Sequence, residues 1–204
     1  MIRNIIFDFG NVLGWTLADD TTKTYVADSS VRQQIRNVVF DPADWDRLNR
    51  GTMTDEEMFQ RICSRLPEHL HQDAITVYDN WTNTSRPVPG MAHLVSELKE
   101  KGYRLYLLSN ATLTFSERYR LVPWMSALLE QFDGLVFSAV VGMAKPDREI
   151  YEYVLNTYSL NADECLFVDD YQENIAGAEK LGIQGYRFDG DSEKLKKYIF
   201  SQED

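Results

Sequence analysis

The sequence predicts an α/β fold in which a parallel sheet is flanked by helices and interrupted by a helical insert. Short apolar segments rich in β-branched and aromatic residues alternate with amphipathic helical segments. Parallel strands need long crossover connections, usually helices, so this alternation favours a parallel sheet. The length of 204 residues suits one such domain with a modest insertion.

Apolar runs bounded by turn-forming residues mark the expected strands. They are Ile2–Phe9, Tyr103–Ser109, Leu135–Ala139, Glu164–Val168 and, more weakly, Gln184–Phe188. The expected helices between them have apolar residues on one face. They are Met91–Glu100, Asp147–Tyr158 and Asn174–Leu181.

The stretch from Gly14 to Arg86 breaks this alternation. It is polar and helical in pattern, and its clearest helix is Asp55–Ile62. Thr54 and Glu57 have the spacing of a capping box at the start of that helix. We therefore predict a Rossmann-like α/β core formed by residues 1–13 and 87–204, with a helical cap domain at residues 14–86.

Composition narrows the class of protein. Asp plus Glu number 32 against 21 Lys plus Arg, a formal net charge of −11, which argues against nucleic-acid binding and adhesion to anionic membranes. No apolar run approaches the roughly 18 residues of a membrane span, and the first residues lack a signal-peptide core. Cys63 and Cys165 lie far apart, without metal-ligand spacing. We expect a cytoplasmic protein, monomeric or weakly homodimeric, that acts on a small molecule.

Polar residues follow the expected strands where a ligand would bind. In an open α/β sheet, ligands bind outside the carboxyl ends of the strands. The side chains that end the strands are Asp8 after the first, Ser109 and Asn110 after the second, Lys145 after the third, and Asp169 and Asp170 after the fourth. Carboxylates gathered at one edge are costly unless a cation neutralises them, and Mg²⁺ is the usual cation beside phosphate.

Each of these residues has an ordinary structural interpretation. A lone aspartate at a strand end usually caps a turn or a helix, and a lone lysine usually lies on the surface. Their convergence on one edge of the sheet is what favours a phosphoryl site.

Four ordered motifs across the chain resemble those of the haloacid dehalogenase (HAD)-like hydrolase superfamily, in the branch with a helical cap after the first strand. They are IIFDFGNVL (Ile5–Leu13), LLSNAT (Leu107–Thr112), GMAKPDREIY (Gly142–Tyr151) and LFVDDYQENIAGAEKLG (Leu166–Gly182). The DFGNV form is similar to members that act on sugar phosphates, including glucose-1-phosphate phosphatases.

The resemblance implies roles in phosphoryl transfer. Asp8 would be the nucleophile that forms an aspartyl-phosphate. Lys145 would supply positive charge to the phosphoryl oxygens and to Asp8. The Ser109 hydroxyl and the backbone N–H groups around Asn110 would complete the phosphate site.

The resemblance also implies a magnesium site. Asp8 and Asp170 would bind Mg²⁺ through their side chains, and Gly10 through its backbone carbonyl. Asp169 would be an outer-shell acid or a second ligand, and Asn174 would orient its loop.

The sequence departs from the family at Gly10, where phosphatases usually carry an aspartate that serves as general acid and base. Its loss costs typically 10²–10⁴-fold in rate. Either Asp19 or Asp20 replaces it, or the leaving group needs little protonation, as in a sugar 1-phosphate. In the insert, Trp15, Thr16, Trp45 and Arg47 are expected to pack in the core or lie on the surface rather than contact substrate.

The sequence thus favours a Mg²⁺-dependent phosphatase of a small phosphorylated metabolite, with a sugar phosphate as one candidate. Two alternatives remain. Hydrolysis of a carbon–halogen bond by the same aspartate needs no metal, so the acids Asp169 and Asp170 count against it. A non-catalytic protein that binds a phosphorylated ligand is supported by Gly10.

Overall fold

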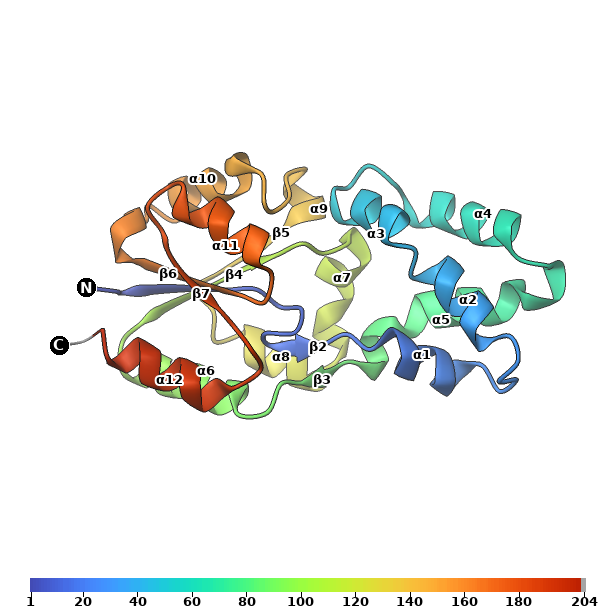
Figure 1. Ribbon diagram of the computed structural model, residues 1–204, viewed down its shortest axis with the longest axis horizontal. Coiled ribbons are helices and arrows are strands. Elements are labelled where there is room, and N and C mark those ends of the chain that lie inside the picture. Colours follow the sequence, from blue (N-terminus) through green and yellow to red (C-terminus); the bar gives the residue numbers. More distant parts are fainter. Residues whose placement is uncertain (203–204) are drawn as a thin grey trace.

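The computed structural model describes residues 1–202, and a five-stranded parallel sheet lies at its centre (Figure 1). Its strand order is β5-β4-β1-β6-β7. The strands are β1 (Asn4–Phe7), β4 (Arg104–Ser109), β5 (Gly134–Phe137), β6 (Cys165–Asp169) and β7 (Gln184–Arg187). The parallel sheet predicted from the sequence is confirmed, while Glu203 and Asp204, which belong to the predicted core domain, lie outside the described residues.

The central position of β1 decides where a ligand can bind. Its neighbours are β4 on one side and β6 on the other, and Phe7 pairs with Leu107 and with Val168. Strand order therefore reverses at β1, and the carboxyl end of this strand is the switch point at which open α/β sheets bind ligands.

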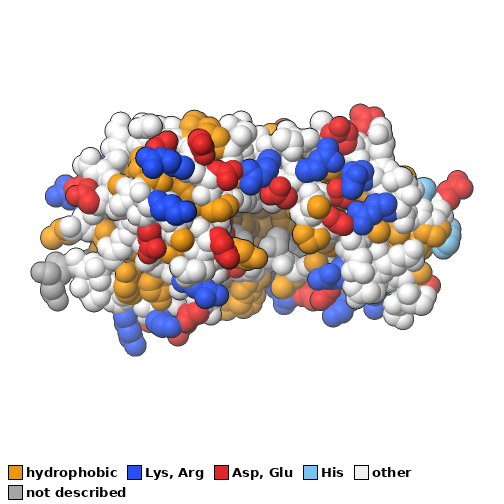
Figure 2. Space-filling model, turned by 45° about the horizontal axis from the view of Figure 1, so that its top comes forward, with side chains coloured by type: hydrophobic (Ala, Val, Ile, Leu, Met, Phe, Trp, Pro, Cys, Tyr) orange, Lys and Arg blue, Asp and Glu red, His pale blue; other side chains and the backbone are white. Residues whose placement is uncertain are grey.

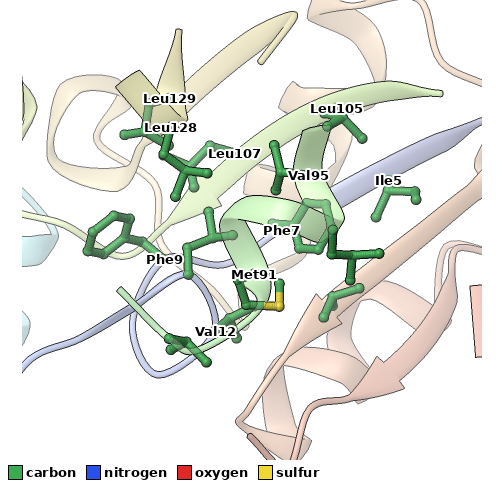
Figure 3. Packing of buried hydrophobic residues seen from close by; sticks show 14 of the residues in the cluster. Ile5, Phe7, Phe9, Val12, Met91, Val95, Leu105, Leu107, Leu128 and Leu129 are labelled. Carbon is green, nitrogen blue, oxygen red and sulfur yellow. The ribbon is translucent and has the colours of Figure 1, made fainter. Parts of the chain in front are cut away.

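Helices cover both faces of the sheet. Side chains of a strand alternate between faces, so Ile5 and Phe7 join one apolar cluster while Ile6 joins another. The first cluster packs against α6 (Met91–Glu100), α8 (Pro123–Leu129) and α12 (Ser192–Phe200), and Figure 3 shows Met91, Val95, Leu128 and Leu129 around Phe7 and Ile5. The second packs against α10 (Arg148–Thr157) and α11 (Gln172–Glu179).

Between β1 and α6 the chain forms a group of helices beyond the carboxyl ends of the strands (Figure 1). They are α1 (Ala18–Tyr25), α2 (Arg32–Val39), α3 (Pro42–Asn49), α4 (Asp55–Arg65) and α5 (His71–Asn80). These helices enclose an apolar cluster of their own, which includes Ile35, Met58 and Val77. The chain enters and leaves this group of helices through a short antiparallel pair of strands, β2 (Gly14–Trp15) and β3 (Arg86–Pro87).

The capping box expected at the start of α4 is present. The Glu57 N–H donates to Thr54 Oγ1 at 3.1 Å, and the Thr54 N–H donates to Glu57 Oε2 at 2.8 Å. These two bonds satisfy N–H groups that have no partner inside the helix. The helix continues to Arg65, three residues beyond the expected end at Ile62.

Three predicted strands end too late: β1 ends at Phe7 instead of Phe9, β5 at Phe137 instead of Ala139, and β7 at Arg187 instead of Phe188. Ala139 lies not in β5 but in the short helix α9 (Ser138–Val141), because the Ser138 hydroxyl and the Ala139 N–H bond to Asn49 and Ala111 instead of a neighbouring strand. The remaining helices are α7 (Leu113–Arg118) and the 3-10 turns Glu68–Leu70, Trp81–Thr84, Tyr119–Leu121 and Ala162–Glu164. Within residues 1–202, no helix has both the length and the apolar character needed to cross a bilayer.

Candidate active site

Asp8, Lys145 and Asp169 form a buried charged cluster at the end of β1. Lys145 Nζ lies 2.8 Å from Asp8 Oδ1 and 2.6 Å from Asp169 Oδ2. Asp8 follows β1 directly and Asp169 ends the adjacent strand β6. All three side chains are nearly inaccessible to solvent, so one ammonium group compensates two carboxylates in a medium where unpaired charge is costly.

Asn110 fixes the backbone that carries Lys145. The Lys145 N–H donates to Asn110 Oδ1 at 2.9 Å, and Asn110 Nδ2 donates to the Lys145 carbonyl at 2.9 Å. The Asn110 amide is therefore occupied by two reciprocal bonds across the ends of β4 and the loop before α10. Its side chain positions Lys145, and a role of Asn110 in substrate binding stays a prediction.

Asp169 is held by the turn that follows it. Its Oδ1 accepts the Tyr171 N–H at 2.8 Å, and Asn174 Nδ2 donates to its two carboxylate oxygens at 3.1 and 3.0 Å. The Tyr151 hydroxyl in turn donates to the Asn174 carbonyl at 2.7 Å. With Lys145 on its other oxygen, Asp169 has both carboxylate oxygens engaged.

Asp170 is the more accessible acid of the pair. It is half-buried, and Asn11 Nδ2 donates to its Oδ2 at 3.0 Å. Carboxylate oxygens of Asp8, Asp169 and Asp170 all lie within 4.8 Å of one another. Within residues 1–202, the Gly10 carbonyl accepts no hydrogen bond. Oxygen ligands in this arrangement fit a hard divalent cation.

Burial shapes the electrostatics of this cluster. It raises the pKa of Asp8 to about 7; Lys145 opposes that rise and the charge of Asp169 adds to it. Burial alone would lower the pKa of Lys145, but Asp8 and Asp169 hold it above its usual range. Lys145 is therefore charged at neutral pH. A second cation nearby would favour the ionised form of Asp8, which is the nucleophilic form.

A cavity of about 220 Å³ opens beside this cluster, between the core and the insert helices. Ser109, at the end of β4, and Gly10, after Asp8, belong to its lining. Among the described residues, no protein group hydrogen-bonds to the Ser109 hydroxyl. It is buried and available to a group bound next to Asp8.

A family model matches this chain and describes haloacid dehalogenase-like hydrolases; the match covers residues 2–182. The chain belongs to the haloacid dehalogenase-like hydrolase family. Two phosphatases are similar to it over most of their length. The sesquiterpene phosphatase astK of Aspergillus oryzae is 30% identical over 88% of this chain and 86% of its own. The D-ribitol-5-phosphate phosphatase of Bacteroides thetaiotaomicron is 25% identical over 92% of both.

A solved structure shares the fold of this HAD-like hydrolase. It is that of a HAD family enzyme of Bacteroides thetaiotaomicron in complex with magnesium and inorganic phosphate. It superimposes with a TM-score of 0.70 at 22% identity and covers 96% of this chain and 99% of the other. The insert helices and the sheet thus have their counterparts in the family's fold.

Two residues expected as replacements for the missing acid lie elsewhere in this HAD-like hydrolase. Asp19 forms an ion pair with Arg36, and Asp20 forms one with Arg86. Neither lines the cavity. The geometry gives no support for either as an acid at the phosphoryl site.

Four insert residues were expected to pack in the core or lie on the surface. Trp45 and Thr16 line the cavity, while Trp15 and Arg47 do not; that none of the four contacts substrate stays a prediction. Asn11 was given no role from the sequence, yet it bonds to Asp170. The available sequence signal was its place three residues after the nucleophile candidate, and its φ of 54° in the structure is one that asparagine tolerates.

Proposed function

We propose that this protein is a Mg²⁺-dependent phosphatase that hydrolyses a small phosphorylated metabolite through an aspartyl-phosphate on Asp8. One observation carries the proposal: Asp8 lies at the switch point of the sheet, 2.8 Å from the Lys145 ammonium and beside two further carboxylates. The two phosphatases similar to the chain support the same chemistry.

Asp8, Asp170 and the Gly10 carbonyl would hold Mg²⁺. Asp169 would hold Lys145 and the turn after β6 in position. Asp169 is the poorest ligand because Lys145, Tyr171 and Asn174 already occupy its oxygens. When bound, Mg²⁺ neutralises charge on the phosphoryl oxygens and on the carboxylates around them. The magnesium and phosphate in the Bacteroides enzyme support this assignment.

In the first step a carboxylate oxygen of Asp8 attacks phosphorus. A new O–P bond forms, the bond from phosphorus to the leaving oxygen breaks, and the electron pair of that bond leaves with the alcohol oxygen. Lys145 and the Ser109 hydroxyl stabilise the charge on the equatorial oxygens. The departing oxygen takes its proton from water, because Gly10 supplies none.

In the second step water attacks the aspartyl-phosphate. The O–P bond to Asp8 breaks, the carboxylate is regenerated, and inorganic phosphate leaves with the oxygen of water. The same missing side chain at Gly10 would have activated this water. We therefore expect hydrolysis of the phosphoenzyme to limit turnover when the leaving group is good.

Residues 14–86 act as a cap in this proposal. Their helices form one wall of the cavity, and the core forms the other. A substrate bound between the two would be shielded from water, which strengthens the electrostatic interactions at Asp8. A cytoplasmic location and a monomeric or weakly dimeric state remain predictions from composition.

Release of phosphate from a panel of phosphorylated metabolites, with Mg²⁺ and with EDTA, tests the proposal. We expect metal-dependent release that Asp8→Asn abolishes and that Asp163→Asn retains, since Asp163 is an exposed acid far from the site. A folded protein that binds Mg²⁺ and releases phosphate from nothing would contradict the proposal. The non-catalytic phosphate-binding alternative, which Gly10 favours, would then replace it.

A further inference from the structure

The cavity beside Asp8 is lined mainly by apolar side chains, and the polar side chains among them are uncharged. Among residues 1–202, its lining contains no acidic, basic or histidine side chain. The hollow between the two parts of the molecule can be followed in Figure 2, where hydrophobic and uncharged surface lies inside it and charged side chains surround it. Its aromatic lining residues are Phe9, Phe40, Trp45, Trp81 and Phe115, and Leu17 lies in the wall formed by the insert.

Aromatic rings form a continuous chain along this wall, from the insert to the residue next to Asp8. Phe40 stacks on Trp45 with ring centroids 5.7 Å apart, and Trp45 meets Trp81 edge-on at 5.2 Å. Trp81 stacks on Phe115 at 5.6 Å, and Phe115 meets Phe9 at 4.8 Å. Such a wall favours a flat apolar body, because rings gain from stacked or edge-to-face contact beyond the area they bury.

Several polar groups in the lining are already engaged. The Trp45 indole N–H donates to the Val39 carbonyl, and the Thr21 hydroxyl donates to the Leu17 carbonyl. Thr112 accepts the Phe115 N–H, and the Asn110 amide is bonded to Lys145. Among the described residues, the side chains of Thr16, Asn49 and Ser109 in the lining make no protein hydrogen bond. They are fewer than the hydroxyls of a hexose, so a sugar would lose water that this cavity replaces only in part, which is costly.

Gly10 places a second, independent demand on the leaving group. Without a general acid beside Asp8, the departing oxygen must carry negative charge until water protonates it. An alkyl alcohol does this poorly, whereas a phenol, with a pKa of about 10 like the tyrosine side chain, does it well.

We infer that the substrate is an aryl phosphate, a phosphomonoester of a compact uncharged aromatic alcohol, whose ring occupies this cavity. A sugar 1-phosphate has a leaving group that needs little protonation, but its body is too polar for the cavity walls. An alkyl phosphate has an apolar body, but its leaving group needs a proton. The cavity of about 220 Å³ is smaller than the roughly 300–1,000 Å³ of typical small-molecule sites, so a one- or two-ring body fits it best. This inference rests on the proposed phosphatase activity.

Four substrates separate the two demands: 1-naphthyl phosphate, hexyl phosphate, glucose 1-phosphate and glucose 6-phosphate. We expect kcat/KM with Mg²⁺ to be highest for 1-naphthyl phosphate. Highest activity on glucose 1-phosphate would overturn the inference and leave the phosphatase proposal standing. Hexyl phosphate equal to or better than 1-naphthyl phosphate would overturn the aromatic assignment. Phosphate release from none of the four or from any wider panel would contradict the phosphatase proposal itself.

A paired substitution tests whether the cavity wall is responsible. Leu17 precedes α1 at the N-cap position, where asparagine is favoured, so Leu17→Asn adds polarity to the wall without opposing the helix. It should lower the ratio of kcat/KM for 1-naphthyl phosphate to that for glucose 1-phosphate by about tenfold. Leu121→Asn makes the same change at an exposed leucine outside the lining and should not alter the ratio. An unchanged ratio in Leu17→Asn would overturn the inference.

Discussion

A Cβ atom added to Gly10 would lie 3.9 Å from Oδ2 of Asp8, and apart from the chain neighbours of Gly10 it would meet no other atom within 4 Å. The position that lacks a general acid is therefore open, and it is next to the nucleophile candidate. Gly10 is not among the residues with positive φ, so a side chain there is not opposed by the backbone.

Gly10→Asp should supply the missing acid. We expect it to accelerate turnover of hexyl phosphate and glucose 6-phosphate, whose leaving groups need protonation, by about 10²-fold or more. For 1-naphthyl phosphate the rate of the 1-naphthol burst, which reports the first step, should change far less, whereas steady turnover should rise because the aspartate also activates water in the second step. Initial rates on these substrates check the prediction, with Gly10→Asn as a control of the same size that cannot donate a carboxyl proton. Equal effects of the two variants would show that acid catalysis is not what position 10 lacks.

The sequence was sufficient to predict this edge of the sheet. Buried runs of β-branched and aromatic residues placed Asp8, Ser109 and Asp169 at strand ends, and a parallel sheet brings such ends together. The parallel sheet and the capping box at Thr54 are confirmed. These features depend on local patterns and on one topological rule.

The cavity could not be predicted in the same way. Phe9 and Phe115 meet within the core, whereas Trp45 reaches the same cavity from the insert, which folds against the ends of the strands. Composition alone does not distinguish such rings from ordinary core residues, which aromatics usually are. Asp19 and Asp20 were candidates because they follow Asp8 closely in the sequence. The sequence could not show that each of them pairs with an arginine instead.

Lys145→Met should destabilise the protein strongly. It leaves the buried carboxylates of Asp8 and Asp169 without their counter-ion, a loss that costs about 3–5 kcal/mol for a buried pair. The free energy of unfolding in urea, with EDTA at pH 8, measures it. Lys99→Met removes an ammonium 2.8 Å from Asp133 nearer the surface and should cost about 1 kcal/mol or less. Similar costs for the two variants would contradict the burial argument.

The contribution of Asp8 to stability without magnesium, measured as the difference between wild type and Asp8→Asn, should fall as pH rises from about 4 to 7. The pKa of Asp8 is about 7 in the folded protein against an ordinary value of 3.8, so the folded state binds more protons in this window and loses stability as they leave. Mg²⁺ favours ionised Asp8, so its stabilising effect on Tm should be larger at pH 8 than at pH 5. Thermal unfolding of wild type and Asp8→Asn at both pH values checks this. A magnesium effect on Tm that is equal at the two pH values in wild type would contradict it.

The most direct measurement is a rapid acid quench of the enzyme with 1-naphthyl phosphate and Mg²⁺, followed by mass spectrometry of the peptide that contains Asp8. Attack by Asp8 with a good leaving group, and slow hydrolysis without a base at Gly10, should give a burst of 1-naphthol equal in amount to the enzyme. The phosphoryl group should then be found on Asp8, and Asp8→Asn should show neither. Steady phosphate release with no phosphorylated Asp8, undiminished in Asp8→Asn, would rule out Asp8 as the nucleophile.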